Sequence, residues 1–189
     1  MSTSHAIVQG SVRFAILSVL SYAVWAFGGR MSTITLYTTT ALVFVALSGP
    51  LLYPLLPPPG RLRKLYAVFV PGFIAYAALW CVGWFVIRAA AGEILGSAAG
   101  LAAFTIIIVL ILRPRASFLA IFAILFTFHT LGYTIGGMCY YAANGQGILA
   151  PLLETHIALG RLLWGFFHGL GFGAGLGFAF SQSRPQKRG

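Results

Sequence analysis

Long apolar runs alternate with short polar segments along the whole chain. Each run approaches or exceeds the roughly 20 residues that a helix needs to cross the hydrocarbon core of a bilayer. The separators contain turn-forming and helix-breaking residues, among them Gly28-Gly29, Pro57-Pro58-Pro59 and Asn144-Gly145. The pattern predicts an all-α, polytopic membrane protein with six transmembrane helices in a single domain, followed by a basic tail at 182–189. The helices are expected at residues 12–28, 32–53, 65–87, 93–112, 117–141 and 150–181.

Composition supports a membrane protein and argues against a nucleic-acid partner. Apolar residues make up 59% of the chain and charged residues 7%, against about 25% charged residues in soluble domains. The net charge of +10 comes from twelve Lys and Arg opposed only by Glu93 and Glu154. These basic residues stand singly or in short clusters between apolar runs, which is typical of topology signals and lipid headgroup contacts.

The distribution of Lys and Arg predicts the orientation of the chain. Two of them, Arg30 and Arg88, fall at one set of alternate connections, and Arg161 lies inside the last apolar run. The other nine fall on the opposite side: Arg13, Arg61, Arg63, Lys64, Arg113, Arg115, Arg184, Lys187 and Arg188. Because cytoplasmic connections carry the excess of basic residues, we expect both termini in the cytoplasm and the chain in an inner or plasma membrane.

Glycines at every fourth position mark the last apolar run. Small residues at this spacing let helix backbones approach closely inside a membrane. The ridge consists of Gly165, Gly169, Gly173 and Gly177. It is compatible with packing inside one bundle or with a seam between subunits. Gly171 and Gly175 form a second small face, which suits a helix that contacts both its own bundle and a neighbouring copy, so we expect a homo-oligomer.

Four polar residues are expected at membrane depth. Glu154, Arg161 and His168 follow one another at intervals of seven and would share one stripe of the last helix. The spacing favours an Arg161 that reaches outward or pairs with Glu154, and an anionic headgroup contact is the alternative. His168 and His129 fall at similar depth on two helices and would face each other.

A facing histidine pair allows three interpretations. The two rings could be hydrogen-bonded core residues, axial ligands of a haem in a redox subunit, or part of a proton relay. A path past Arg161 and His168 would suit a small transporter or channel. The sequence supplies no third ligand and no carboxylate cluster beside the pair, so it predicts no metal site.

An aromatic stripe and two hydroxyls predict a lipid groove. The stripe lies on one face of helix 65–87 and comprises Phe69, Phe73, Tyr76 and Trp80, while Thr35 and Thr39 lie one turn apart on helix 32–53. Pro50 and Pro71 should kink and splay these two helices. A splayed pair would hold a lipid tail against the aromatic face and its headgroup near the hydroxyls. Membrane hydroxyls also commonly bond back to their own helix.

No motif for catalysis is present. The sequence holds no phosphate-binding loop, no Ser/His/Asp set and no paired carboxylates, so we expect no enzymatic activity and no cofactor other than a bound lipid.

Several segments resemble the Insig family of six-helix, sterol-responsive membrane proteins. Gly49-Pro50-Leu51-Leu52-Tyr53-Pro54 is similar to that family's Gly-Leu-Leu-Tyr-Pro at the end of the second helix, and Ala67-Val68-Phe69-Val70 opens the third in a similar way. Arg113-Pro114-Arg115-Ala116-Ser117 resembles its Arg-Ser-Arg-Ser turn, and Tyr133 with Tyr140-Tyr141 its tyrosine-rich fifth helix. The resemblance implies a non-enzymatic sensor that holds a sterol or diacylglycerol-like lipid among its first helices. It also implies regulation through contacts with another membrane protein.

Overall fold

The computed structural model describes residues 2–183, and this part of the chain consists of helices joined by loops and turns. Within it, six helices are long and apolar enough to cross a membrane, which confirms the all-α fold and a multi-pass membrane protein. They are α1 (Thr3–Phe27), α2 (Thr33–Leu52), α3 (Arg61–Ile87), α4 (Ala90–Leu112), α5 (Phe118–Ala143) and α7 (Ile157–Gln182). A 3-10 turn, η1 (Tyr53–Leu55), follows α2, and a short helix, α6 (Ala150–Leu153), precedes α7. Of the predicted basic tail, Arg184, Lys187 and Arg188 lie outside the described residues.

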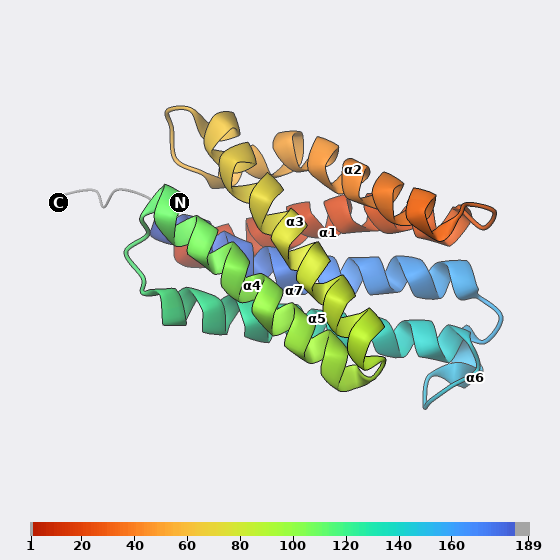
Figure 1. The fold of residues 1–189 in the computed structure, drawn as a ribbon. Helices are drawn as coiled ribbons and strands as arrows, with labels where there is room; N and C mark the ends of the chain where they lie inside the picture. The colour runs from red at the N-terminus through yellow and green to blue at the C-terminus, as the bar shows by residue number, and fades with distance from the viewer. Residues whose placement is uncertain (1, 184–189) are drawn as a thin grey trace.

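The long helices run alternately up and down, so their connections gather at two ends of the bundle (Figure 1). One end, called the basic end here, holds Ser2, the loop 53–60, the turn 113–117 and the end of α7. The backbone N–H of Arg115 donates to the carbonyl of Gln182 at 3.1 Å, which joins two of these segments. The opposite end holds the turns 28–32 and 88–89 and the loop 144–156.

Helix α7 lies at the centre and is wedged between α1 and α5. Its glycine ridge faces α1: a Cβ at Gly169 would come within 2.6 Å of the Ala15 Cα, and Gly173 and Gly177 meet the carbonyls of Gly10 and Ala6. The second face is used as well, because Gly171 and Gly175 lie against Phe128 and Leu125 of α5. Both small faces therefore pack inside one chain. The ridge on α7 is not free to form a subunit seam, so the expected homo-oligomer would need another surface.

The remaining helices attach to this three-helix core in two pieces. Helices α3 and α4 form a tight hairpin in which Gly83 and Gly96 allow close backbone contact. Helix α2 packs mainly on α1 and makes few contacts with α3. It is held at the basic end, where the Arg13 guanidinium donates to the Leu51 carbonyl at 3.1 Å. From there α2 and α3 diverge toward the opposite end (Figure 1).

Four phenylalanines close the core at the junction of these pieces. Phe14 stacks on Phe172 at 4.8 Å between centroids, and Phe69 lies within about 6 Å of both Phe14 and Phe104. All four are fully buried. Phe69, predicted as a lipid-binding residue, lies in this core, where its ring packs against Phe14 of α1 and Phe104 of α4, and it is not among the residues that line the cavity described below.

Two helix boundaries differ from the prediction for physical reasons. Helix α1 begins at Thr3 instead of residue 12, because Ser2 caps it by accepting from the His5 N–H at 3.2 Å and because Ala6 and Gly10 pack on α7. The predicted helix 150–181 is broken at 154–156 and begins again at Ile157. Three successive polar residues, Glu154-Thr155-His156, interrupt the apolar run, and Thr155 adopts a left-handed conformation with a φ of 72°.

Candidate functional site

A cavity with a volume of about 410 Å³ lies between α2 and α3, in the half of the bundle nearer the opposite end. Its walls come from five of the long helices and from one residue of α4. We call it the aromatic cavity, and it is lined by Tyr22, Trp25, Leu36, Tyr37, Thr40, Ala41, Phe44, Phe73, Tyr76, Ala77, Trp80, Cys81, Trp84, Glu93, Tyr133, Tyr140, Tyr141, Trp164 and His168. The volume falls within the usual range for small-molecule pockets, about 300–1,000 Å³.

Three of the six predicted lipid-binding residues line this cavity, and three do not. Phe73, Tyr76 and Trp80 form the α3 wall. The two threonines, Thr35 and Thr39, are absent from the lining, and the hydroxyl of Thr35 lies 2.8 Å from that of Ser32. The two threonines lie off this cavity because the lining face of α2 is rotated relative to them. That face carries Leu36, Tyr37, Thr40, Ala41 and Phe44.

The sequence did not predict that α1, α5 and α7 contribute walls to this cavity. Tyr22 and Trp25 come from α1, Tyr133 and Tyr140 from α5, and Trp164 from α7. All four tryptophans of the chain line the cavity. The sequence signal for these walls is the spacing of tryptophan and tyrosine by three, four or seven residues on several helices. This spacing indicates a shared cavity only when the arrangement of the helices is known.

The two intramembrane histidines meet, as their depth predicted. The rings of His129 and His168 lie 5.2 Å apart between centroids and nearly perpendicular, at 89°. The Tyr76 hydroxyl lies 2.7 Å from His129 Nε2, so one ring nitrogen of His129 already has a partner. A haem between two axial histidines would need a slab of space between the rings. Direct ring contact leaves none, so this geometry does not favour a haem at the pair.

Arg161 is engaged by α1. Its Nη1 donates to the Trp25 carbonyl at 2.9 Å, and its guanidinium carbon lies 4.7 Å from the centroid of the Trp25 ring. The carbonyl belongs to the last turn of α1, where carbonyls have no partner within the helix. Glu154 is not on α7, so the predicted stripe of Glu154, Arg161 and His168 is wrong at its first member. Its side chain lies beside Gly145.

The aromatic cavity has little charge. Glu93, at the start of α4, is its one carboxylate, and no Lys or Arg is among the residues that line it.

No known protein family, characterised protein or solved structure matches this chain. Function must therefore be argued from the geometry of the cavity and the chemistry of its walls.

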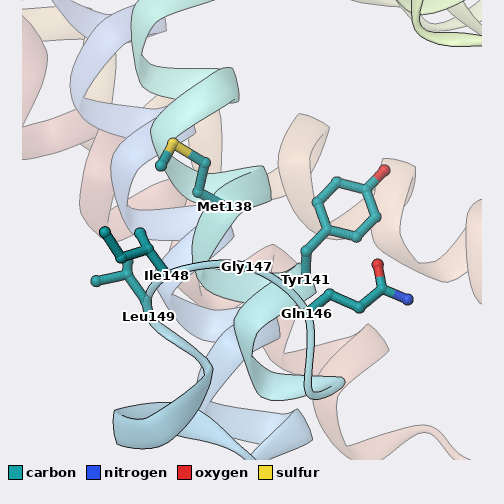
Figure 2. Close-up of a pocket in the computed structure, with 6 residues that line it drawn as sticks. All are labelled: Met138, Tyr141, Gln146, Gly147, Ile148 and Leu149. Atoms are coloured by element: carbon teal, nitrogen blue, oxygen red, sulfur yellow. The ribbon is translucent and has the colours of Figure 1, made fainter.

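A second hollow of about 310 Å³ lies where the loop after α5 crosses the end of that helix. Figure 2 shows Ile148 and Leu149 on one side of this loop and Tyr141 and Gln146 on the other, with Met138 above them. Ile148 is 85% exposed. The hollow has no ionisable group apart from the Tyr141 phenol, so it offers shape and apolar surface but no chemistry.

Proposed function

We propose that this chain is a non-enzymatic lipid-binding protein that holds one uncharged lipid, such as a sterol or a diacylglycerol, in the aromatic cavity. The observation that carries this proposal is a large aromatic-walled cavity inside a membrane-spanning bundle, at a place where two helices diverge. Apolar walls favour a hydrocarbon ligand, because its chains can pack against them without burying an unpaired polar group. A sensing role of the kind found in the Insig family, with a second membrane protein as partner, fits this proposal.

The charge of the cavity supports an uncharged ligand. A phosphate headgroup inside a membrane protein is best held by a cation, because neutral donors do not compensate its charge. The lining of the cavity has neither Lys nor Arg, and the guanidinium of Arg161 is held by Trp25. The nearest carboxylate, Glu93, would repel an anion. Phospholipids with a bare phosphate are therefore poor candidates compared with lipids whose polar group is a hydroxyl or an ester.

We also propose that the basic end faces the cytoplasm. Arg61, Arg63 and Lys64 open α3 at this end, and Arg113 and Arg115 lie in the turn between α4 and α5. This places the wide side of the cavity in the outer half of an inner or plasma membrane. The ligand would then come from the outer leaflet.

Tryptophan fluorescence tests the occupancy of the cavity, because the four tryptophans all line it. The purified chain in phospholipid nanodiscs would be titrated with a diacylglycerol that carries dibrominated chains, which quench tryptophan on contact. We expect saturable quenching at about one lipid per chain. Phosphatidylcholine with the same brominated chains should quench weakly and in proportion to its mole fraction. Equal, unsaturable quenching by both lipids would contradict the proposal.

A matched pair of variants separates the cavity from the outer surface of the same helix. Ala77 lines the cavity on α3, whereas Ile74 does not line it and is 58% exposed. Ala77→Phe should fill part of the cavity and abolish the saturable quenching, and Ile74→Phe should leave it unchanged. Mass spectrometry of lipids that copurify with the wild-type chain would identify the natural ligand.

A further inference from the structure

Four side chains on one side of the aromatic cavity have buried polar atoms without a hydrogen-bond partner in the described part of the chain. These atoms are Trp80 Nε1, the Tyr133 hydroxyl, Trp164 Nε1 and both ring nitrogens of His168. All four residues line the cavity. We call this group the polar wall. His168 is 4% exposed, so bulk solvent cannot supply its partners.

The polar wall is a compact group centred on Tyr133. Its ring lies 5.2 Å from Trp164, 6.0 Å from His168 and 6.5 Å from Trp80, measured between ring centroids. The Tyr133 hydroxyl faces Trp80 and Glu93 without meeting hydrogen-bond geometry with either. The wall belongs to α3, α5 and α7, whereas the facing side of the cavity comes from α2, which packs on α1 and not on α5 or α7.

The depth of the polar wall makes its unpartnered atoms costly. Tyr76, His129 and His168 lie near the middle of their helices, and Trp80, Tyr133 and Trp164 each lie about one turn closer to the opposite end. A polar group without a partner in hydrocarbon costs several kcal/mol, because no water is available to it. Neighbouring side chains cover these atoms, so a polar group that enters the cavity would bond to them after small rotations of the wall side chains.

The donors and acceptors of the wall define that group. The two indole N–H groups only donate, the tyrosine hydroxyl donates or accepts, and a neutral histidine offers one donor and one acceptor. A hydroxyl complements this set best, because it can accept from an indole or the phenol and donate to the free ring nitrogen of His168. An ester oxygen would satisfy the donors alone. A phosphate would bring negative charge to a site without a cation.

We propose that the polar wall is a hydroxyl-binding subsite that orients the lipid. The hydroxyl of an uncharged lipid binds to Tyr133, Trp164 and His168 about one turn from mid-membrane, and its hydrocarbon lies against Phe44 and Phe73. This inference rests on the proposed function, since it concerns the ligand of the same cavity. It adds that the polar end is held deep, by α5 and α7, and not at the rim formed by Tyr37 and Tyr141.

The test compares three single-chain probes with the same tail: oleyl alcohol, oleyl methyl ether and oleyl phosphate. Each would compete with the brominated diacylglycerol for the wild-type chain in nanodiscs. A net hydrogen bond changes affinity by roughly three- to tenfold. We expect the alcohol to bind about three- to tenfold more tightly than the methyl ether, and the phosphate to bind no better than the ether. Equal affinities of alcohol and ether, or tightest binding of the phosphate, would overturn the subsite.

Two tyrosine variants locate the hydroxyl. Tyr133→Phe keeps the ring and its packing but removes the central polar atom of the wall, and Tyr37→Phe makes the same change at the rim. Tyr133→Phe should abolish the preference for the alcohol while the methyl ether binds as before, and Trp164→Phe provides an independent second variant. A preference lost in Tyr37→Phe but kept in Tyr133→Phe and Trp164→Phe would overturn the deep placement. If water alone satisfies the wall, none of the variants alters the affinity of any probe, which also overturns it.

The outcomes distinguish this inference from the proposed function. Saturable quenching by the brominated lipid, with no discrimination between alcohol and ether, leaves lipid binding in place and removes the polar wall as a subsite. Absence of saturable quenching in the wild-type chain removes both.

Discussion

The hydroxyl of Tyr76 and Nε2 of His129 lie 2.7 Å apart in the middle of the bundle, where they join α3 to α5. Both side chains are buried, at 6% and 1% exposure. The contact is significant because α3 and α4 form a hairpin of their own, and a hydrogen bond surrounded by hydrocarbon fixes how that hairpin meets the central helices.

Loss of this hydrogen bond should destabilise the fold. Tyr76→Phe leaves His129 with no partner for Nε2, and we expect a loss of about 1–2 kcal/mol in the free energy of unfolding. Unfolding in mixed detergent micelles would measure it. Tyr53→Phe is the matched control, because Tyr53 is 41% exposed, and it should change stability little. The double variant Tyr76→Phe, His129→Phe should lose less than the sum of the two single variants, and additive losses would argue against a direct bond.

Two glycines in long helices should respond in opposite directions to alanine. A Cβ at Gly169 would come within 2.6 Å of the Ala15 Cα, so Gly169→Ala must push α1 away and should destabilise by about 1–3 kcal/mol. At Gly137 the nearest atoms would be 4.0 Å away, so Gly137→Ala should gain up to about 1 kcal/mol from helix propensity. Unfolding midpoints of the two variants check this directly. Similar effects at both positions would contradict the packing of α1 on α7.

Arg161 and Glu154 should behave as independent residues. Arg161→Met removes the bond to the Trp25 carbonyl and the stacking on the Trp25 ring, and we expect a loss of about 2 kcal/mol. Glu154→Gln should alter stability by less than about 0.5 kcal/mol, because Glu154 lies outside α7 on an exposed connection. Equal losses of stability in the two variants would indicate an ion pair between Arg161 and Glu154. They would contradict the contact of Arg161 with the end of α1.

Labelling in intact cells checks the orientation. In a chain with Cys81 and Cys139 replaced by alanine, single cysteines would be placed at Arg63 and at Gln146, which are both exposed. Arg63 lies in the first turn of α3 at the basic end, and Gln146 lies in the loop 144–156 at the opposite end. A maleimide that does not cross membranes should label Gln146→Cys at once. It should label Arg63→Cys only after permeabilisation. The reverse pattern would place the basic end outside, and the cavity would then open toward the inner leaflet.

Sequence patterns predicted the architecture because bilayer thickness fixes the length of each apolar run. They failed at helix boundaries, which depend on capping side chains and on packing against neighbouring helices. The start of α1 is less apolar than the rest of that helix, but the side chain of Ser2 and the fit of Gly10 against α7 extend the helix to Thr3. The break before α7 depends on three polar residues that window averages absorb into a long hydrophobic run.

The candidate site was predicted only on the helix whose aromatic stripe is continuous. The face of α3 follows from helical periodicity, so Phe73, Tyr76 and Trp80 were found. Depth alone brought His129 and His168 together, because both lie near the middle of their helices. The rotation of α2 has no such signal, so the sequence indicates Thr35 and Thr39, whereas Thr40 is the threonine that lines the cavity. Whether a stripe faces a cavity or a core also depends on the helix beside it, as the burial of Phe69 shows.

Glycines of α5 and α7 set the positions of two walls of the aromatic cavity. A Cβ at Gly165 would lie 2.7 Å from the Cβ of Tyr22, and a Cβ at Gly136 of α5 would lie 2.7 Å from the Cα of Trp164. Two wall residues are therefore backed by positions that have no room for a side chain. A single methyl group at either glycine would shift a wall of the cavity without touching its contents. The width of the cavity thus depends on the spacing between backbones, at glycines that are not among its lining residues.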